Sequence, residues 1–122
     1  MQTSVVNIHG GKSIYDQYIG RPGQGQDGYF GNPHSVHVKD KPWTTCKVCK
    51  QAHTREEAVI AYQKDFNARV STDLAFKQRV ENLRGKTLGC FCRPKNGFQG
   101  KLMCHGQVIA GFLDGKRPED VD

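Results

Sequence analysis

The chain has 122 residues, which is the size of one domain and too short to divide into two cores. Its hydrophobic content is 36% and its formal net charge is +6, so we expect a modest core and an anionic partner. Five cysteines, an odd number, and an N-terminus without signal-peptide features argue against a secreted disulfide scaffold. No stretch approaches the roughly 18 apolar residues of a membrane span. The composition therefore predicts a cytoplasmic protein with reduced cysteines and no membrane partner.

The N-terminal part of the sequence predicts two short strands and then a long loop. Residues 4–8 form a β-prone run that ends at two glycines, and residues 13–19 form a second run that ends at a glycine. Residues 20–53 contain five glycines and three prolines, a density that argues against regular structure. A loop of this length usually has a function, or needs a metal ion to order it.

The glycines of this loop include a match to the dinucleotide-binding pattern G-x-G-x-x-G at residues 23–28. No helix follows the match, so the pattern lacks the context that would make it a dinucleotide site. A glycine-rich loop still offers backbone N–H groups to an anion, and Arg21 lies at its start. A plain flexible loop is the alternative.

The end of the same loop carries a metal-binding pattern. Cys46 and Cys49 have the spacing at which two thiolates hold one tetrahedral ion, and His53 lies within reach of that ion. His37 and His34 are the nearest candidates for a fourth ligand, with a later cysteine as the rival. Structural zinc contributes on the order of 10 kcal/mol of apparent binding energy in small zinc peptides. We therefore predict a zinc clip formed by His37, Cys46, Cys49 and His53, with reduced, unligated cysteines as the alternative.

Two helices are predicted after the loop. Thr54 and Glu57 form a capping-box pattern at the start of the first helix. Ser71 or Thr72 is expected to cap the second helix, and Gly85 to end it in the left-handed conformation. The apolar stripe of the first helix is Val59, Tyr62, Phe66 and Val70, and that of the second is Phe76, Val80 and Leu83.

The rest of the chain predicts a strand and a last helix in a basic segment. Residues 86–92 have strand character, and a helix from about residue 104 to residue 113 is expected to end at Gly115. Residues 82–113 contain no Asp or Glu, and the basic residues of this segment are Arg84, Lys86, Arg93, Lys95 and Lys101. Such a segment favours phosphate or nucleic acid, with a solvated basic face as the alternative. The tail, residues 114–122, is acidic by contrast.

The basic segment also contains a second group of cysteine and histidine residues. A strand directs Cys90 and Cys92 to the same face, and Cys104 and His105 lie where the last helix begins. A helix start favours a thiolate or a bound anion. Three interpretations stay open: a second zinc site, a reactive centre with a cysteine nucleophile or a histidine base, and buried structural thiols.

Five motifs follow one another along the chain. They are Y-I-G-R-P from residue 18, G-N-P from residue 31, T-R-E-E-A from residue 54, L-R-G-K-T-L-G-C-F-C from residue 83 and C-H-G from residue 104. This succession resembles an uncharacterised phage and bacterial family, domain of unknown function 4326. The resemblance implies a fold and a set of positions, including the packing of Cys104 against Cys90 and Cys92, but no activity. The loop with Cys46 and Cys49 departs from the family pattern and looks like a local elaboration.

We therefore predict one α/β domain over residues 1–122, with a short sheet covered by about three helices. Ligands of open α/β sheets bind near the strand ends, where we expect the glycine loop and the second cluster to converge. The residues expected to line this site are Arg21, Asn32, Arg55, Cys90, Cys92, Cys104 and His105.

Two classes of function fit this description. The first is a zinc-supported module that binds nucleic acid or a phosphorylated nucleotide, whose phosphates meet Arg21, Arg55, Arg84, Arg93 and Lys95. The second is a small enzyme of nucleotide or nucleic-acid metabolism, with His105 as general acid or base and Cys92 or Cys104 as nucleophile or metal ligand. A third possibility, a phage factor that binds a host protein, would leave almost no trace in the sequence.

Overall fold

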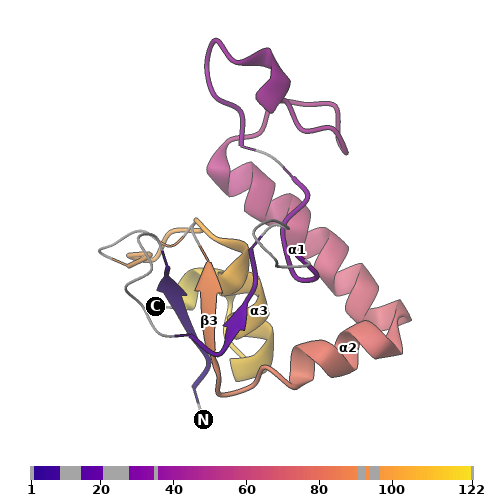
Figure 1. Cartoon of the computed structure of the whole chain (residues 1–122), viewed down its shortest axis with the longest axis vertical. Coiled ribbons are helices and arrows are strands. Elements are labelled where there is room, and N and C mark those ends of the chain that lie inside the picture. The colour runs from indigo at the N-terminus through magenta and orange to yellow at the C-terminus, as the bar shows by residue number, and fades with distance from the viewer. Residues whose placement is uncertain are drawn as a thin grey trace.

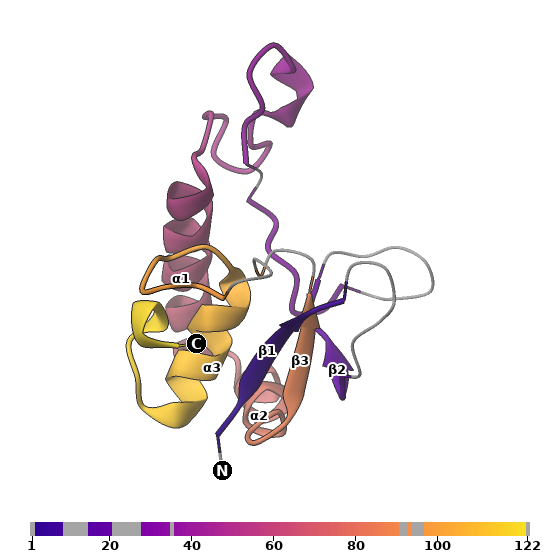
Figure 2. The same cartoon turned by 90° about the vertical axis from the view of Figure 1, so that its left-hand side faces the viewer.

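The computed structural model describes residues 2–8, 15–20, 28–34, 36–90, 93 and 97–121. These residues form a small α/β domain with a three-stranded sheet, three α-helices and two short 3-10 helices (Figures 1 and 2). The elements in chain order are β1 (Ser4–Asn7), β2 (Gln17–Tyr18), η2 (Pro42–Thr44), α1 (Arg55–Thr72), α2 (Leu74–Glu81), β3 (Thr87–Cys90), α3 (His105–Asp114) and η3 (Pro118–Asp120). The predicted fold class is confirmed.

The three strands are parallel, and β3 lies between β1 and β2. The register pairs Val5 of β1 with Leu88 of β3, and both side chains are buried. A central parallel strand is covered on both faces, which explains the apolar bias of residues 86–92 in the sequence. Parallel strands bring their carboxyl ends to one edge of the sheet. The segments that follow β1, β2 and β3 therefore begin at the same edge.

The start of α1 follows the sequence prediction. The Glu57 N–H donates to the Thr54 hydroxyl over 3.2 Å, and the Thr54 N–H donates to the Glu57 carboxylate over 2.7 Å. The bond from the Thr54 N–H, together with that from its side chain, holds the pKa of Glu57 below its ordinary value. This capping box fixes where α1 begins, and with it the position of Arg55.

The junction between α1 and α2 differs from the prediction. Ser71 and Thr72 belong to α1, because their hydroxyls donate back to carbonyls one turn earlier, each over 2.9 Å. Asp73 is the cap of α2 instead, and its carboxylate accepts the Phe76 N–H over 3.1 Å. A serine or threonine can lie inside a helix when its hydroxyl donates to a carbonyl of the preceding turn. The residue types at positions 71 and 72 therefore did not locate the boundary between α1 and α2.

Helices α1 and α3 lie on the same side of the sheet (Figure 2), and their apolar stripes form the core with the sheet residues. Gly106, at the start of α3, makes this approach close. A Cβ at Gly106 would lie 3.0 Å from side-chain atoms of Val5 and Ile19. The missing side chain lets the first turn of α3 rest on the sheet, which places His105 beside the end of β2. At its other end α3 stops at Gly115, with φ 69°, as predicted.

Residues 36–53, which we call the lobe, project beyond the N-terminal end of α1 (Figures 1 and 2). The lobe contains η2, none of whose residues is buried, and two isolated β-bridges, Val38 to Lys41 and Cys46 to Gln51. Because it contributes little to the apolar core, something else must hold its shape. Among the described residues, no helix has the length and apolar character needed to cross a membrane.

Candidate metal centre and adjoining pocket

Two cysteines and two histidines come together at the base of the lobe. The ligand atoms of His34, Cys46, Cys49 and His53 all lie within 4.8 Å of one another. A tight turn presents the two sulfurs: the Lys50 N–H donates to the Cys46 carbonyl over 2.7 Å, and Lys50 has a φ of 57°. Within the described part of the chain, these four side chains are the one group of three or more that could hold a metal ion.

His34 is oriented by a carboxylate. Its Nε2 lies 2.6 Å from the Asp65 carboxylate of α1, and its Nδ1 lies 3.5 Å and 3.3 Å from the sulfurs of Cys46 and Cys49. Burial lowers the pKa of His34, but hydrogen bonds to Asp65 and Cys46 outweigh burial and raise it overall. With its proton on Nε2, beside Asp65, His34 would offer Nδ1 to an ion held by the two sulfurs. Histidines that bind metals usually have such a carboxylate partner.

His53 supplies an independent test of whether the group fits an ion. Its side chain is 8% exposed, and its buried Nε2 has no hydrogen-bond partner in the described structure. An unpaired buried nitrogen costs about 1 to 3 kcal/mol. An ion bound to Cys46 and Cys49 would satisfy this nitrogen, so the residues present fit a metal.

His37, which the sequence analysis placed in the ligand set, lies outside this group. Its Nδ1 is 3.2 Å from the Thr44 hydroxyl, and its backbone N–H donates to the His53 carbonyl over 2.8 Å. His37 therefore supports the loop, while His34, the other candidate, takes its place. Spacing along the chain could not choose between them. The choice is made by Asp65, which lies 31 residues away from His34.

The second cluster is described only in part. The sulfurs of Cys90 and Cys104 are 3.2 Å apart and fully buried, which agrees with the packing that the family resemblance implies. Cys104 is disulfide-bonded, so the expectation that every cysteine is reduced is wrong for this residue. Cys92 lies outside the described residues. The Cys104 sulfur also accepts the Gly106 N–H over 3.3 Å, which caps α3.

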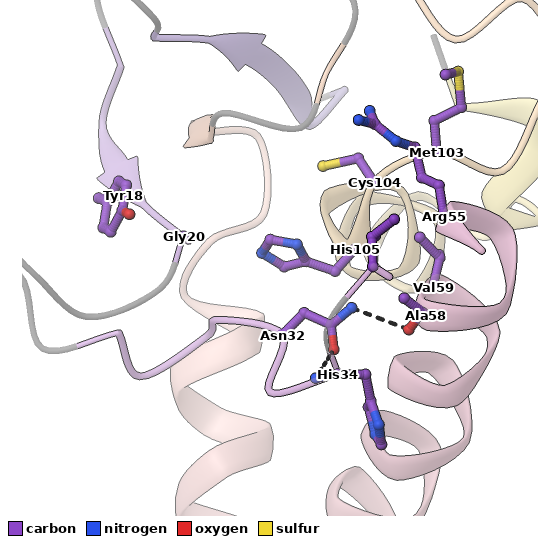
Figure 3. Close-up of a pocket in the computed structure, with 11 residues that line it drawn as sticks. Tyr18, Gly20, Asn32, His34, Arg55, Ala58, Val59, Met103, Cys104 and His105 are labelled. Carbon is purple, nitrogen blue, oxygen red and sulfur yellow. Dashed lines mark hydrogen bonds between the residues drawn. The ribbon is translucent and has the colours of Figure 1, made fainter. Parts of the chain in front are cut away.

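A pocket of about 290 Å³ adjoins the metal group, with which it shares His34. Three parts of the chain contribute: the end of β2, the segment before the lobe with the first turns of α1, and the start of α3. The lining residues are Tyr18, Gly20, Asn32, His34, Val36, Arg55, Ala58, Val59, Met103, Cys104 and His105 (Figure 3). The pocket therefore lies at a carboxyl end of the sheet, where the sequence analysis placed the site.

The polar side chains of the pocket are held by neighbouring backbone. The Asn32 amide donates to the Ala58 carbonyl over 3.0 Å and accepts the His34 N–H over 2.9 Å, as Figure 3 shows. His105 Nε2 lies 2.5 Å from the Ile19 carbonyl, to which it donates. Through its bonds to Ala58 and His34, Asn32 connects the pocket wall to the metal group.

The groups around the pocket also give it a positive electrostatic potential. Arg55 is the first residue of α1, and His105 is the first residue of α3, so two helix N-termini meet at the cavity. Helix N-termini favour anions, and Arg55 adds a permanent positive charge. Val59 and Met103 supply apolar surface beside these groups.

Other residues predicted for the site lie elsewhere. Arg84 donates to the Leu113 carbonyl, at the end of α3 opposite His105. The guanidinium of Arg93 lies over the Phe98 ring, 5.5 Å from its centroid, and is not part of the pocket lining. Cys90 lies behind Cys104 and does not line the cavity. Arg21 and Lys95, like Cys92, lie outside the described residues.

Sequence reasoning missed several contributors, among them Asp65, Val36 and Met103. Asp65 is one of many charged residues on α1, and its sequence position carries no sign that it faces a histidine. Val36 and Met103 lie in irregular segments without a periodic pattern, so nothing in the sequence marks them as pocket walls.

The chain was compared with known proteins. A family model described as "Domain of unknown function (DUF4326)" matches residues 6–115, which confirms the resemblance seen in the sequence. The chain is 41% identical over 67 residues to a protein of Enterobacteria phage T4 described as "Uncharacterized 12.4 kDa protein in nrdA-td intergenic region". That match covers 55% of the chain and 56% of the phage protein, so the chain spans about half the length of this relative. No solved structure matches the chain.

Proposed function

The chain belongs to the family described as "Domain of unknown function (DUF4326)", and we propose that it is a zinc-supported domain that binds a phosphorylated nucleotide. The description of the family assigns no activity. The proposal therefore rests on the geometry of the metal group and of the pocket beside it.

Zinc is the metal that suits the ligand set. Two cysteine sulfurs and two histidine nitrogens are a common tetrahedral set in structural zinc sites. All four positions are filled by protein, so the ion would order the lobe and would not act on a substrate. The carboxylate of Asp65 behind His34 supports this interpretation.

The observation that carries the nucleotide proposal is the meeting of two helix N-termini and Arg55 at one cavity with apolar walls. The positive ends of α1 and α3 suit a phosphate group, and a guanidinium binds phosphate with paired hydrogen bonds. The walls formed by Val59 and Met103 suit the flat face of a base. Inorganic phosphate alone would leave these walls uncovered, and a nucleoside alone carries no anionic group for the two helix N-termini and Arg55.

We propose that the pocket binds its ligand without turnover, and that Cys104 and His105 of the second cluster do not form a reactive centre. A cysteine nucleophile acts as an exposed thiolate, whereas the Cys104 sulfur is fully buried and disulfide-bonded. His105 is buried and donates to the Ile19 carbonyl, which fixes the ring as part of the pocket wall.

Calorimetric titration with nucleoside monophosphates tests the proposal. We expect a monophosphate to bind more tightly than its nucleoside and more tightly than inorganic phosphate. A charge-assisted hydrogen bond contributes about 1.5 to 3 kcal/mol, so Arg55→Ala should weaken binding by roughly 10- to 150-fold. Lys77→Ala, which removes an exposed positive charge from α2, is the matched control and should bind as the wild type does. Unchanged binding in Arg55→Ala, or no binding of any monophosphate to the wild type, would contradict the proposal.

A further inference from the structure

The lobe carries a group of exposed apolar side chains that neither the metal nor the pocket uses. Trp43 is 71% exposed, Val48 is 60% exposed and Val38 is 44% exposed. Single exposed apolar residues are normal on a protein surface. A tryptophan this exposed is less ordinary, because its large ring usually finds cover or a partner.

The lobe is also positively charged. Lys39, Lys41, Lys47 and Lys50 are all exposed, and Asp40 is the one acidic residue of the lobe. In the described part of the chain the ion pairs involve other cations, so no acidic side chain neutralises these four lysines.

The lobe holds these groups in a defined arrangement. The Thr44 hydroxyl donates to the Lys41 carbonyl over 2.6 Å and accepts the Val38 N–H over 2.8 Å, which fixes the segment that carries Trp43. Lys47, Val48 and Lys50 lie on the turn between Cys46 and Gln51 that presents the sulfurs. The backbone that carries the ring and the cations is therefore held in place by these bonds.

We propose that the lobe is a docking surface for single-stranded nucleic acid, on which a base stacks against Trp43 and the lysines contact the phosphates. Single-strand binding sites combine a positive surface that follows the backbone with aromatic rings that stack on bases. A duplex keeps its bases paired and would leave the indole ring unused, and an acidic peptide would use the lysines but not the ring. The inference rests on the proposed metal, which holds the lobe, and does not depend on the nucleotide pocket.

Trp43 is the single tryptophan of the chain, so its fluorescence reports directly on this surface. We expect an oligothymidine of about a dozen nucleotides to quench this fluorescence saturably. Stacking contributes about 1 to 3 kcal/mol per base, so Trp43→Ala should weaken binding of the labelled oligonucleotide by roughly 5- to 150-fold, as measured by anisotropy. Trp43→Phe should restore part of the loss. Leu74→Ala, which truncates an 80% exposed apolar side chain at the start of α2, is the control and should bind normally.

The lysines are tested by salt dependence. Between roughly 50 and 200 mM salt, Lys41→Ala and Lys47→Ala should each lower the slope of log affinity against log salt by about 0.7. Arg55→Ala should leave oligonucleotide binding intact, which separates this surface from the pocket. The inference is overturned if the oligonucleotide leaves Trp43 fluorescence unchanged, if Trp43→Ala with normal zinc content binds like the wild type, or if duplex DNA or polyglutamate binds and quenches equally well.

Discussion

At the scale of single residues, His34 connects the two features of the site. Its ring faces the sulfurs of Cys46 and Cys49, and its backbone N–H is held by Asn32, which also bonds to α1 in the pocket wall. A change in the position of the His34 ring would therefore be transmitted to the pocket by one short segment. Asp65 is the residue that sets that position.

The first prediction concerns Asp65→Asn. The substitution keeps the size of the side chain but removes the charge that holds the proton on His34 Nε2. Loss of a carboxylate partner behind a metal-bound histidine typically lowers metal affinity by about 10- to 100-fold. Competition with a chromogenic chelator measures the affinity, with Glu81→Gln as a control for the loss of an acidic charge elsewhere. An Asp65→Asn protein that holds zinc as tightly as the wild type would show that His34 is not oriented in this way.

At the scale of elements, the N-terminal end of α1 supports both the lobe and the pocket. His53 of the metal group directly precedes the cap Thr54, and Arg55 of the pocket directly follows it. The capping box therefore fixes the point at which the lobe joins the helix. Because the pKa of Glu57 is lowered, the stability of this junction depends on pH.

The second prediction follows from the direction of that pKa. Because folding lowers the pKa of Glu57, its contribution to stability is present above the unfolded pKa and is lost as pH falls through the lower folded pKa. Glu57→Gln keeps an acceptor for the Thr54 N–H but has no carboxylate to protonate. Urea unfolding across acidic pH should therefore show a flatter loss of stability in Glu57→Gln than in the wild type. Glu56→Gln, outside the capping box, is the control, and equal slopes in the two variants would refute the prediction.

The sequence predicted the features of this fold that are local. The capping box, the apolar stripes, the left-handed Gly115 and the two-cysteine turn each depend on residues within one or two turns of one another. The features that it did not predict depend on long-range contacts. His34 is selected over His37 by Asp65, and Arg84 is drawn to the end of α3 by a carbonyl 29 residues away. Spacing along a chain carries no information about such partners.

At the scale of the whole molecule, the structure is an α/β body with a projecting lobe (Figures 1 and 2). The body has its own apolar core, whereas the lobe has a group of two cysteines and two histidines at its base. Zinc would stabilise the lobe directly, and it would also stabilise the pocket through the segment that carries His34. Acid should release the metal, because thiolates and neutral imidazoles are the forms that bind it.

We propose that zinc is bound by His34, Cys46, Cys49 and His53. The most direct measurement is elemental analysis of the purified protein combined with X-ray absorption at the zinc edge. We expect about one zinc per chain, with two sulfur and two nitrogen ligands, and a chelator that removes it should lower the melting temperature. A protein that purifies without metal, and whose melting temperature is the same with and without chelator, would contradict the claim.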